Sequence, residues 1–460
     1  MVATAISQNL YLEYSNTQSL SFNENSGRLN FGYRSFRMLA MEKIRILGDN
    51  NIQLKGKVKI SGAKNAVLPA IAACLLTREK VRLKNVPLVK DVFTILTLMK
   101  ELGARYQLKK NSLSIQVKDF ESAEASYELV RAMRASILVL GPLLARFGKA
   151  VVALPGGCAI GSRPIDLHIH GLEKLGASIN LEHGYIKAEA KSLQGKVIEF
   201  EKKSVGGTEN LVMAAALAKG ETILKKCALE PEVTNLCELL VKMGAKIDGA
   251  GEETIRIKGV KELGGASHDI IPDRIEAGTF LVAGALTRGN FILTHTRPDH
   301  LGLIIEKLRY SGAKIEELNS HSLRVIGSEE IKPQDITTSP YPGFPTDMQA
   351  QFIVLMTQAS GTSIITETIF DRRFSHINEL LRLGANIEVY GDKAIVKGKT
   401  PLSGAETIAT DLRASASLVL AGLIAKGETV VNEVEHLDRG YEKLEEKLKS
   451  LGARIQRIRE

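Results

Sequence analysis

A short phrase recurs six times along this chain of 460 residues. It is written KELGARYQ, EKLGASIN, VKMGAKID, RYSGAKIE, LRLGANIE and KSLGARIQ, with glycines at Gly103, Gly176, Gly244, Gly312, Gly384 and Gly452. Successive glycines lie 73, 68, 68, 72 and 68 residues apart. Each phrase predicts a helix that ends on a left-handed glycine, followed by the start of a strand. Since small solenoid repeats run about 20 to 50 residues, a unit of this length is predicted to be a subdomain.

A second pattern lies before each phrase and adds another helix to the unit. It is an apolar, alanine-rich helix closed by glycine and followed by a strand, as in AAALAKGETILKK, LVAGALTRGNFIL and LVLAGLIAKGETVV. A helix such as 415–426 is apolar on all sides and is therefore predicted to be buried, with sheets covering a core of helices. A single core stops growing near about 250 to 300 residues, so the chain is expected to form two domains or a repeated architecture.

Charged residues begin the predicted inner helices at corresponding places in the six units. They are Lys64, Arg134, Glu209, Arg274, Asp347 and Arg413. Helix N-termini carry unsatisfied N–H groups that favour phosphate or carboxylate. The repeat therefore predicts that charged helix starts converge on one hub. The alternative is that they are ordinary caps and surface ion pairs, and Asp347 in particular occupies a capping position.

The two longest spacings contain two unusual loops, LPGGCAIGSRPIDLH at 154–168 and SPYPGFPTDMQAQ at 339–351. Insertions on a common scaffold are typical of functional loops. Cys158 lies in the first loop. An isolated cysteine is often a small buried apolar residue, but the neighbouring proline and paired glycines favour a reactive thiol. Pro164 is predicted to begin a helix whose apolar side carries Ile165, Ile169 and Leu172.

Composition excludes several classes of function. No run of 18 apolar residues occurs, so no membrane span is expected. The four cysteines form no CxxC pair, which favours a reducing, cytoplasmic setting. No metal-ligand cluster, HExxH or P-loop is present, so we expect no cofactor. The net charge of +9 is scattered, Trp is absent and aromatic residues make up 5%, which argues against nucleic acid and suits small anionic substrates.

Residues 1–40 differ from the rest of the chain. They are rich in Ser and Asn, contain only Glu13 and Glu24 as acidic residues, and show no sustained periodicity. We interpret them as a disordered extension or the product of an upstream start codon, with Met41 as the true beginning. A targeting peptide is the alternative.

From about Met41 to its end, the chain resembles the UDP-N-acetylglucosamine enolpyruvyl transferases. The resemblance rests on SGAKNA (61–66), MRAS (133–136), PGGCAIGSRPIDLH (155–168), PDRIE (272–276), FPTDMQAQ (344–351), TDLRAS (410–415) and DRGY (438–441). It implies an α/β fold, a two-domain inside-out barrel built from six βαβαββ-type repeats of about 70 residues. One domain would comprise 41–62 and 272–460, and the other, which carries the Cys158 loop, 63–271.

The reaction implied by the resemblance moves the enolpyruvyl group of phosphoenolpyruvate to the 3′-hydroxyl of UDP-N-acetylglucosamine. Phosphate is released, and peptidoglycan synthesis begins with this step. Cys158 matches the proton donor, which phosphoenolpyruvate or fosfomycin can capture covalently. Asp347 matches the base. The positions that match the phosphoenolpyruvate site are Lys64, Asn65, Arg163, Arg413 and Arg439.

For the nucleotide sugar, the matching positions are Arg134, Arg163, Pro164, Ile165, Asp166, Leu167, Lys202, Lys203, Ser204, Val205, Asp347 and Ile369. Lys202 and Lys203 could instead be a solvated pair. Three more positions match polar residues nearby, Glu230, Asp273 and Asp411, with Asp411 expected to orient Arg413. Two rival functions stay open: transfer of enolpyruvyl to shikimate 3-phosphate by the sister family, and a non-catalytic scaffold.

Overall fold

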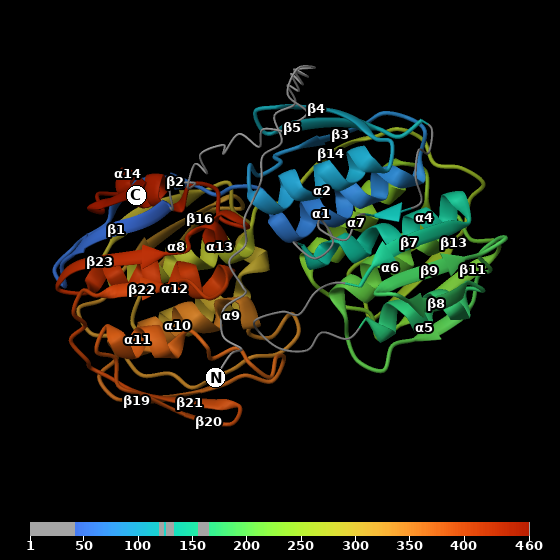
Figure 1. Cartoon of the computed structure of the whole chain (residues 1–460). Coiled ribbons are helices and arrows are strands. Elements are labelled where there is room, and N and C mark those ends of the chain that lie inside the picture. The colour runs from blue at the N-terminus through green and yellow to red at the C-terminus, as the bar shows by residue number, and fades with distance from the viewer. Residues whose placement is uncertain (1–41, 119–123, 126–132, 155–164, 460) are drawn as a thin grey trace, which may run out of the picture. The chain divides into compact units, whose positions relative to one another are not determined.

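The computed structural model describes residues 42–118, 124–125, 133–154 and 165–459. They all belong to one compact unit, Met41–Glu460. In this part of the chain the strands form six four-stranded sheets. In every sheet one edge strand is parallel to its neighbour, and the other neighbouring strands are antiparallel. Figure 1 shows these sheets around groups of helices.

Three of the six units are each built from one continuous segment of the chain. The second unit contains β6 (Glu124–Ala125), η2 (Arg134–Val139), α4 (Leu140–Phe147), β7 (Lys149–Ala153), α5 (Asp166–Lys174), β8 (Ser178–Glu182) and β9 (Tyr185–Glu189). The third contains β10 (Val197–Glu199), α6 (Val205–Ala215), β11 (Glu221–Lys225), α7 (Pro231–Lys242), β12 (Lys246–Asp248) and β13 (Thr254–Lys258). The fifth contains β18 (Ile336–Thr337), η4 (Thr346–Met348), α10 (Gln349–Met356), β19 (Thr362–Thr366), α11 (Ile377–Arg382), β20 (Ile387–Tyr390) and β21 (Lys393–Lys397).

The other three units each borrow one strand from a distant part of the chain. The first contains β14 (Ser267–Asp269), α1 (Lys64–Ala73), η1 (Cys74–Leu76), β3 (Val81–Lys84), α2 (Lys90–Glu101), β4 (Arg105–Lys109) and β5 (Ser112–Gln116). The fourth contains β2 (Lys55–Lys59), α8 (Arg274–Leu286), β15 (Asn290–Thr294), η3 (Pro298–His300), α9 (Gly302–Tyr310), β16 (Lys314–Asn319) and β17 (Ser322–Ile326). The sixth contains β22 (Glu406–Ile408), α12 (Leu412–Ile424), β23 (Gly427–Asn432), α13 (Glu435–Asp438), α14 (Leu444–Ser450), β24 (Ile455–Arg459) and β1 (Glu42–Gly48).

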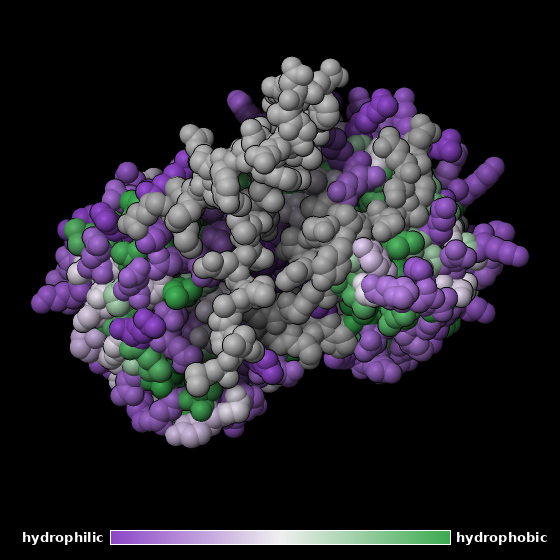
Figure 2. Space-filling view, in the orientation of Figure 1, coloured by the Kyte–Doolittle hydropathy of each residue, from purple (hydrophilic) through white to green (hydrophobic). Residues whose placement is uncertain are grey.

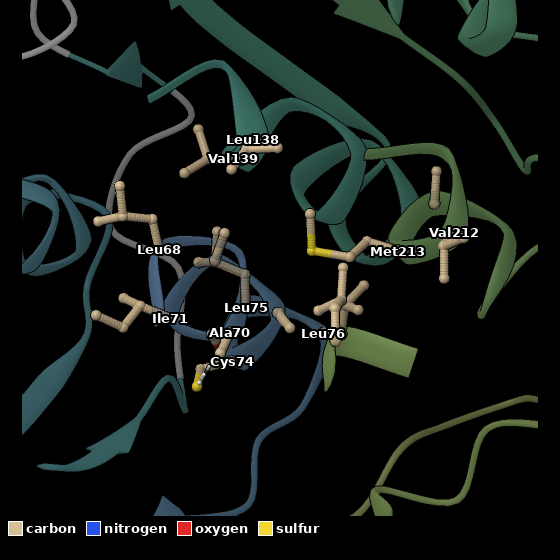
Figure 3. Packing of buried hydrophobic residues seen from close by; sticks show 14 of the residues in the cluster. Leu68, Ala70, Ile71, Cys74, Leu75, Leu76, Leu138, Val139, Val212 and Met213 are labelled. Carbon is tan, nitrogen blue, oxygen red and sulfur yellow. Dashed lines mark hydrogen bonds between the residues drawn. The ribbon is translucent and has the colours of Figure 1, made fainter. Parts of the chain in front are cut away.

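The buried apolar side chains form two separate cores. One runs from Ala63 to Ile270, and the other combines 44–60 with 275–455. Helices α1, α4 and α6 pack together in the first, as do α8, α10 and α12 in the second. Figure 3 shows Leu68 and Ile71 of α1 and Leu75 of η1 near η2 and α6. In α12 every side chain from Arg413 to Ile424 is buried, so the predicted inside-out arrangement of helices within sheets is confirmed.

The six repeat glycines end their helices as predicted. Their φ angles lie between +91° and +104°, a region that strongly favours glycine. The second glycine pattern differs at one place. Before β15 the left-handed residue is Arg288, with φ +47°, and Gly289 is not left-handed. Gly289, which directly precedes β15, therefore does not have a left-handed backbone conformation.

Three of the predicted helix starts need correction. Glu209 lies in the second turn of α6, since the hydroxyl of Ser204 caps that helix by accepting a hydrogen bond from Gly207 N at 3.1 Å. Helix α5 begins at Asp166, after the predicted Pro164, which lies outside the described residues. Asp347 does not cap a helix: it lies inside η4, and neither η4 nor α10 has a side-chain cap.

The surface visible in Figure 2 is hydrophilic over most of its described part, with apolar residues in small separate groups. This agrees with the 25% of charged residues in the sequence. Within the described ranges, no helix combines the length and the hydrophobicity that crossing a bilayer requires.

Candidate active site

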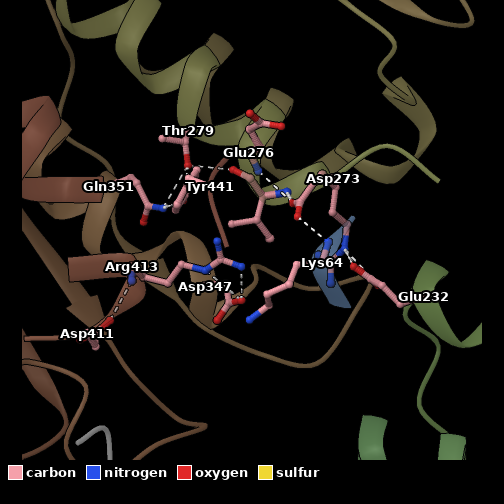
Figure 4. A network of polar contacts seen from close by, with 12 residues as sticks. Lys64, Glu232, Asp273, Glu276, Thr279, Asp347, Gln351, Asp411, Arg413 and Tyr441 are labelled. Atoms are coloured by element: carbon pink, nitrogen blue, oxygen red, sulfur yellow. Dashed lines mark hydrogen bonds and ion pairs between the residues drawn. The ribbon is translucent and has the colours of Figure 1, made fainter. Parts of the chain in front are cut away.

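The starts of the inner helices converge where the two cores meet. Asp273 caps α8 by accepting hydrogen bonds from Ile275 N at 2.8 Å and Glu276 N at 3.0 Å. Its second oxygen accepts a hydrogen bond from the backbone N–H of Lys64, the first residue of α1, at 3.2 Å. One carboxylate thus joins the N-termini of helices from both cores (Figure 4).

Asp347 lies between two buried arginines. Its Oδ2 accepts hydrogen bonds from Arg413 Nε at 3.1 Å and Nη2 at 2.8 Å, and its Oδ1 accepts one from Arg373 Nη2 at 2.9 Å. Both guanidinium side chains are only 4% exposed. Burial alone would raise the pKa of Asp347, but the two arginines outweigh it and hold the pKa well below its ordinary value. The carboxylate is therefore ionised at neutral pH.

The ring of Tyr441 supports the Arg413 guanidinium. The ring centroid lies 5.3 Å from Arg413 Cζ, a cation–π distance. The Tyr441 hydroxyl is 2.9 Å from Thr279 Oγ1 and accepts a hydrogen bond from Gln351 Nε2 at 3.2 Å. Thr279 and Gln351, labelled in Figure 4, thus hold the hydroxyl of Tyr441, and the ring of Tyr441 in turn supports Arg413. Asp411, expected to orient Arg413, instead binds its backbone N–H at 2.8 Å as the cap of α12.

A second carboxylate holds two further cations of the predicted set. Asp91 Oδ1 accepts a hydrogen bond from Arg439 Nε at 2.9 Å, and Asp91 Oδ2 lies 3.6 Å from Lys64 Nζ. Burial lowers the pKa of Lys64, and the charge of Asp91 opposes that shift. Four cations therefore gather around the carboxylates of Asp91 and Asp347, with Asp273 beside Lys64.

A buried ion pair completes the contact between the two cores. Arg274 Nε lies 3.0 Å from Glu232 Oε1, and these side chains are 10% and 3% exposed. The Arg274 guanidinium also lies over the ring of Tyr341, at 5.5 Å from its centroid. Glu230, a residue expected nearby, accepts a hydrogen bond from Tyr341 N at 3.3 Å. These contacts join α7 to α8 and to the 339–351 loop.

Two buried N–H groups at the site lack partners. Among the described residues, no hydrogen-bond acceptor reaches Nη1 of Arg373 or Nη1 of Arg413. Unsatisfied buried donors are costly and are rarely left in proteins without a reason. Two guanidinium groups with spare donors are suited to a bound carboxylate or phosphate.

The residues predicted for the nucleotide sugar lie mostly at two helix starts. Ile165, Asp166 and Leu167 form the beginning of α5, and 202–205 precede and begin α6, which packs against α5. A cavity of about 210 Å³ is lined there by Asp166, Leu167, His170, Gly171, Ile198, Glu199, Phe200 and Glu201. Arg134 begins η2 and contributes to lowering the pKa of the nearby buried His168 to about 4, after burial itself.

The other members of that set are more dispersed. Lys203 pairs with Glu253 at 2.7 Å. Ile369 donates its N–H to Glu367 at 2.8 Å, and Glu367 also binds Thr346, the neighbour of Asp347. Asn65 is half-buried beside Lys64. Cys158, Arg163 and Pro164 lie outside the described residues.

The sequence and the structure were compared with known proteins. Residues 49–448 match the family model of EPSP synthase (3-phosphoshikimate 1-carboxyvinyltransferase). The UDP-N-acetylglucosamine 1-carboxyvinyltransferase of Koribacter versatilis is 57% identical over 91% of this chain and 97% of its own length. That of Solibacter usitatus is 54% identical over 91% of this chain and 100% of its own. The chain belongs to the UDP-N-acetylglucosamine 1-carboxyvinyltransferase family.

Solved structures with a similar fold agree with the family of this chain. The enolpyruvyl transferase NikO from Streptomyces tendae superposes with a TM-score of 0.82 at 25% identity, over 92% of this chain and 100% of that one. An EPSP synthase from Acinetobacter baumannii gives a TM-score of 0.71 at 20% identity over 91% and 100%, a likeness of fold alone. The family resemblance and the α/β fold class predicted from the sequence are confirmed.

Three charged residues at the site of this UDP-N-acetylglucosamine 1-carboxyvinyltransferase family member were not selected by its motifs. They are Asp91, Glu232 and Arg373. Asp91 and Arg439 are separated by 348 residues, so no local pattern could have paired them. Arg373 had a weak signal, since it lies four residues beyond Ile369 in the segment IFDRRF.

Proposed function

We propose that this chain transfers the enolpyruvyl group of phosphoenolpyruvate to the 3′-hydroxyl of UDP-N-acetylglucosamine with release of phosphate. The observation that carries the proposal is the gathering of four cations at the meeting of the two cores. Lys64, Arg373, Arg413 and Arg439 share two carboxylates there. Phosphoenolpyruvate has two anionic groups, a carboxylate and a phosphate, and each requires such cations in a water-poor site.

The reaction is an addition followed by an elimination. The sugar oxygen bonds to C2 of phosphoenolpyruvate while its proton passes to Asp347, and C3 takes a proton from the thiol of Cys158. The bond from C2 to the phosphate oxygen then breaks, C3 loses a proton, and the double bond returns. The cations stabilise the negative charge on the substrate and on the departing phosphate.

Asp347 can act as the base because its environment changes when substrate binds. While Arg373 and Arg413 hold its carboxylate, its lowered pKa makes it a weak base. A substrate carboxylate that accepts hydrogen bonds from the spare Nη1 groups shares the charge of both arginines. The pKa of Asp347 then rises toward the range in which it accepts the hydroxyl proton.

The nucleotide sugar is proposed to lie along the starts of α5 and α6. The support is that Asp166, Leu167 and the segment before Lys202 line one cavity of about 210 Å³. Asp166, the first residue of α5, lines this cavity, and the N–H groups at a helix start favour a diphosphate. Arg134, Arg163 and Ile369 extend this assignment from the motifs.

We also propose how the chain divides into domains, where it is located and which class of ligand it does not bind. The division into 41–62 plus 272–460 and 63–271 is supported by two separate cores. A cytoplasmic location is supported by three buried cysteines without disulfides, Cys74, Cys227 and Cys237. The chain is also proposed not to bind nucleic acid, because its basic residues are scattered in the sequence.

One assay distinguishes the proposed function from its rivals. The protein is incubated with phosphoenolpyruvate and either UDP-N-acetylglucosamine or shikimate 3-phosphate, and phosphate release is measured. Release with the sugar nucleotide alone supports the proposal. Release with shikimate 3-phosphate alone would assign the chain to the sister activity, and no release with either would favour a scaffold.

A second measurement tests the proton donor. Fosfomycin should add one equivalent of mass at Cys158, located by peptide mass spectrometry, and Cys158→Ser should lose turnover at neutral pH. An adduct on another cysteine, or a serine variant with wild-type rates at every pH, would contradict the role assigned to Cys158.

A further inference from the structure

Asp91 is a buried carboxylate that the proposed reaction does not use. It lies in the first turn of α2, and its side chain is 5% exposed. Arg439 approaches it with Nε at 2.9 Å from Oδ1 and Nη2 at 3.5 Å from Oδ2. Lys64 Nζ lies 3.6 Å from Oδ2. A carboxylate in this position is stable only because both cations compensate the loss of its hydration.

The two cations come from different halves of the fold. Lys64 and Asp91 belong to the first unit, and Arg439 follows α13 in the sixth. Their side chains are 13% and 35% exposed, so the described residues enclose neither of them completely. Asp91 therefore contacts two residues that the proposed function assigns to phosphoenolpyruvate, Lys64 in its own core and Arg439 from the other.

We propose that Asp91 is a positioning residue that acts as an internal counter-ion and competes with phosphate for Lys64 and Arg439. It holds both cations in place before substrate binds. When the phosphate of phosphoenolpyruvate arrives, it shares these cations with Asp91, and the two negative charges repel each other. The same repulsion favours the departure of the product phosphate. This inference rests on the proposed function, which places the two cations at the substrate.

The charge of Asp91 also maintains the charge of Lys64. Burial lowers the pKa of Lys64, Arg413 and Arg439 lower it further, and Asp91 and Asp347 raise it. Without Asp91, Lys64 would lose its proton at a lower pH than in the wild type. A variant that lacks this charge is therefore expected to bind phosphate more tightly at pH 6 but to lose that affinity earlier as the pH rises.

The experiment is a calorimetric titration of the full chain with inorganic phosphate at pH 6. Asp91→Asn keeps the size of the side chain and an acceptor for Arg439 but removes the charge. It should lower the Kd for phosphate about tenfold, as expected when a like charge beside the anion is removed. Asp91→Glu should stay within about twofold of the wild type, because it restores the charge. Glu329→Gln is the matched control, since it removes the carboxylate of an exposed arginine pair, Arg288–Glu329 at 2.8 Å.

The outcomes separate this inference from a purely structural role. If Asp91→Asn does not fold, as judged by its thermal transition, Asp91→Ser takes its place with the same expectation. An unchanged or weaker phosphate affinity in the folded variant at pH 6 would overturn the proposal. The proposal would also be overturned if the variant lost its phosphate affinity at the same pH as the wild type. A residue that only supports packing would not change the pH at which this affinity is lost.

The titration is independent of turnover. If the wild type releases no phosphate with UDP-N-acetylglucosamine, the proposed function fails, yet the comparison of phosphate affinities still decides the role of Asp91. If turnover is normal and the affinities do not differ, only the counter-ion role is lost.

Discussion

Replacing Asp347 by Asn tests whether this carboxylate stabilises the two buried arginines. The substitution keeps the shape of the side chain but removes the charge that receives hydrogen bonds of 2.8, 2.9 and 3.1 Å. Arg373 and Arg413, each 4% exposed, would then be left without a counter-charge at this position. Removing one partner of a buried ion pair costs about 3–5 kcal/mol. Since Asp347 is 25% exposed and Asn keeps one acceptor, we expect a loss of about 3 kcal/mol at pH 7.

The pH dependence of this loss follows from the lowered pKa of Asp347. Burial opposes ionisation, but Arg413 and Arg373 bring the folded-state pKa well below the ordinary value. The stabilisation is therefore complete above the pKa of about 3.9 of an unfolded Asp and is lost as the pH falls toward the folded-state pKa. The free energies of unfolding of wild type and variant should differ most at neutral pH and approach each other below about pH 4.

Urea unfolding followed by circular dichroism, in a buffer without phosphate, measures this difference. Glu329→Gln serves again as control and should unfold together with the wild type, because its pair with Arg288 is exposed. Coincident transitions of Asp347→Asn and wild type at pH 7 would refute the role of the carboxylate. A difference that stays constant down to pH 3 would show that the loss does not come from its charge.

Three other predictions concern thiols, a repeat glycine and the ion pair between the cores. Iodoacetamide at pH 8 should alkylate Cys158, as seen by mass spectrometry, and leave the three cysteines whose pKa burial raises, Cys237 to about 12, Cys227 to about 11, and Cys74. Gly244→Ala should lower the free energy of unfolding by about 1 kcal/mol in thermal unfolding, because φ is +104° at this position although no atom blocks a methyl group. Gly302→Ala is the control, with equal space and no left-handed φ, and should not destabilise the protein. Equal behaviour of the two variants would contradict backbone strain at Gly244. Arg274→Met should lower the unfolding temperature, because it leaves Glu232 buried without its partner. Adding Glu232→Gln to this variant should restore part of the loss. Additive effects of the two substitutions would exclude coupling between Arg274 and Glu232.

Much of the fold was accessible from local patterns. A glycine after a helical stretch predicts a left-handed residue whatever the rest of the chain does, and all six repeat glycines follow this rule. The apolar circumference of α12 predicts burial for the same local reason. The helix end before β15 shows the limit of such patterns. The left-handed conformation expected at Gly289 is instead adopted by Arg288, one residue earlier.

The site residues divide in the same way. Motifs selected Lys64, Asp347, Arg413 and Arg439, and the structure brings these four near one another. The capping role expected for Asp347 was wrong, because its carboxylate binds the buried arginines and no helix N–H. No pattern indicated Asp91, which lies 27 residues after Lys64 and 348 before Arg439 in the chain.

The length of the repeat, the ends of the helices, the burial of the inner helices and the family could all be predicted from the order of the residues. Each of these depends on backbone preferences and side-chain polarity within a few turns of chain. Only the tertiary structure decided which carboxylate balances which cation. Coulomb energy and the cost of desolvation depend on distance through space and on burial, and both are set only when the two cores have brought Asp91 to Arg439 and Glu232 to Arg274.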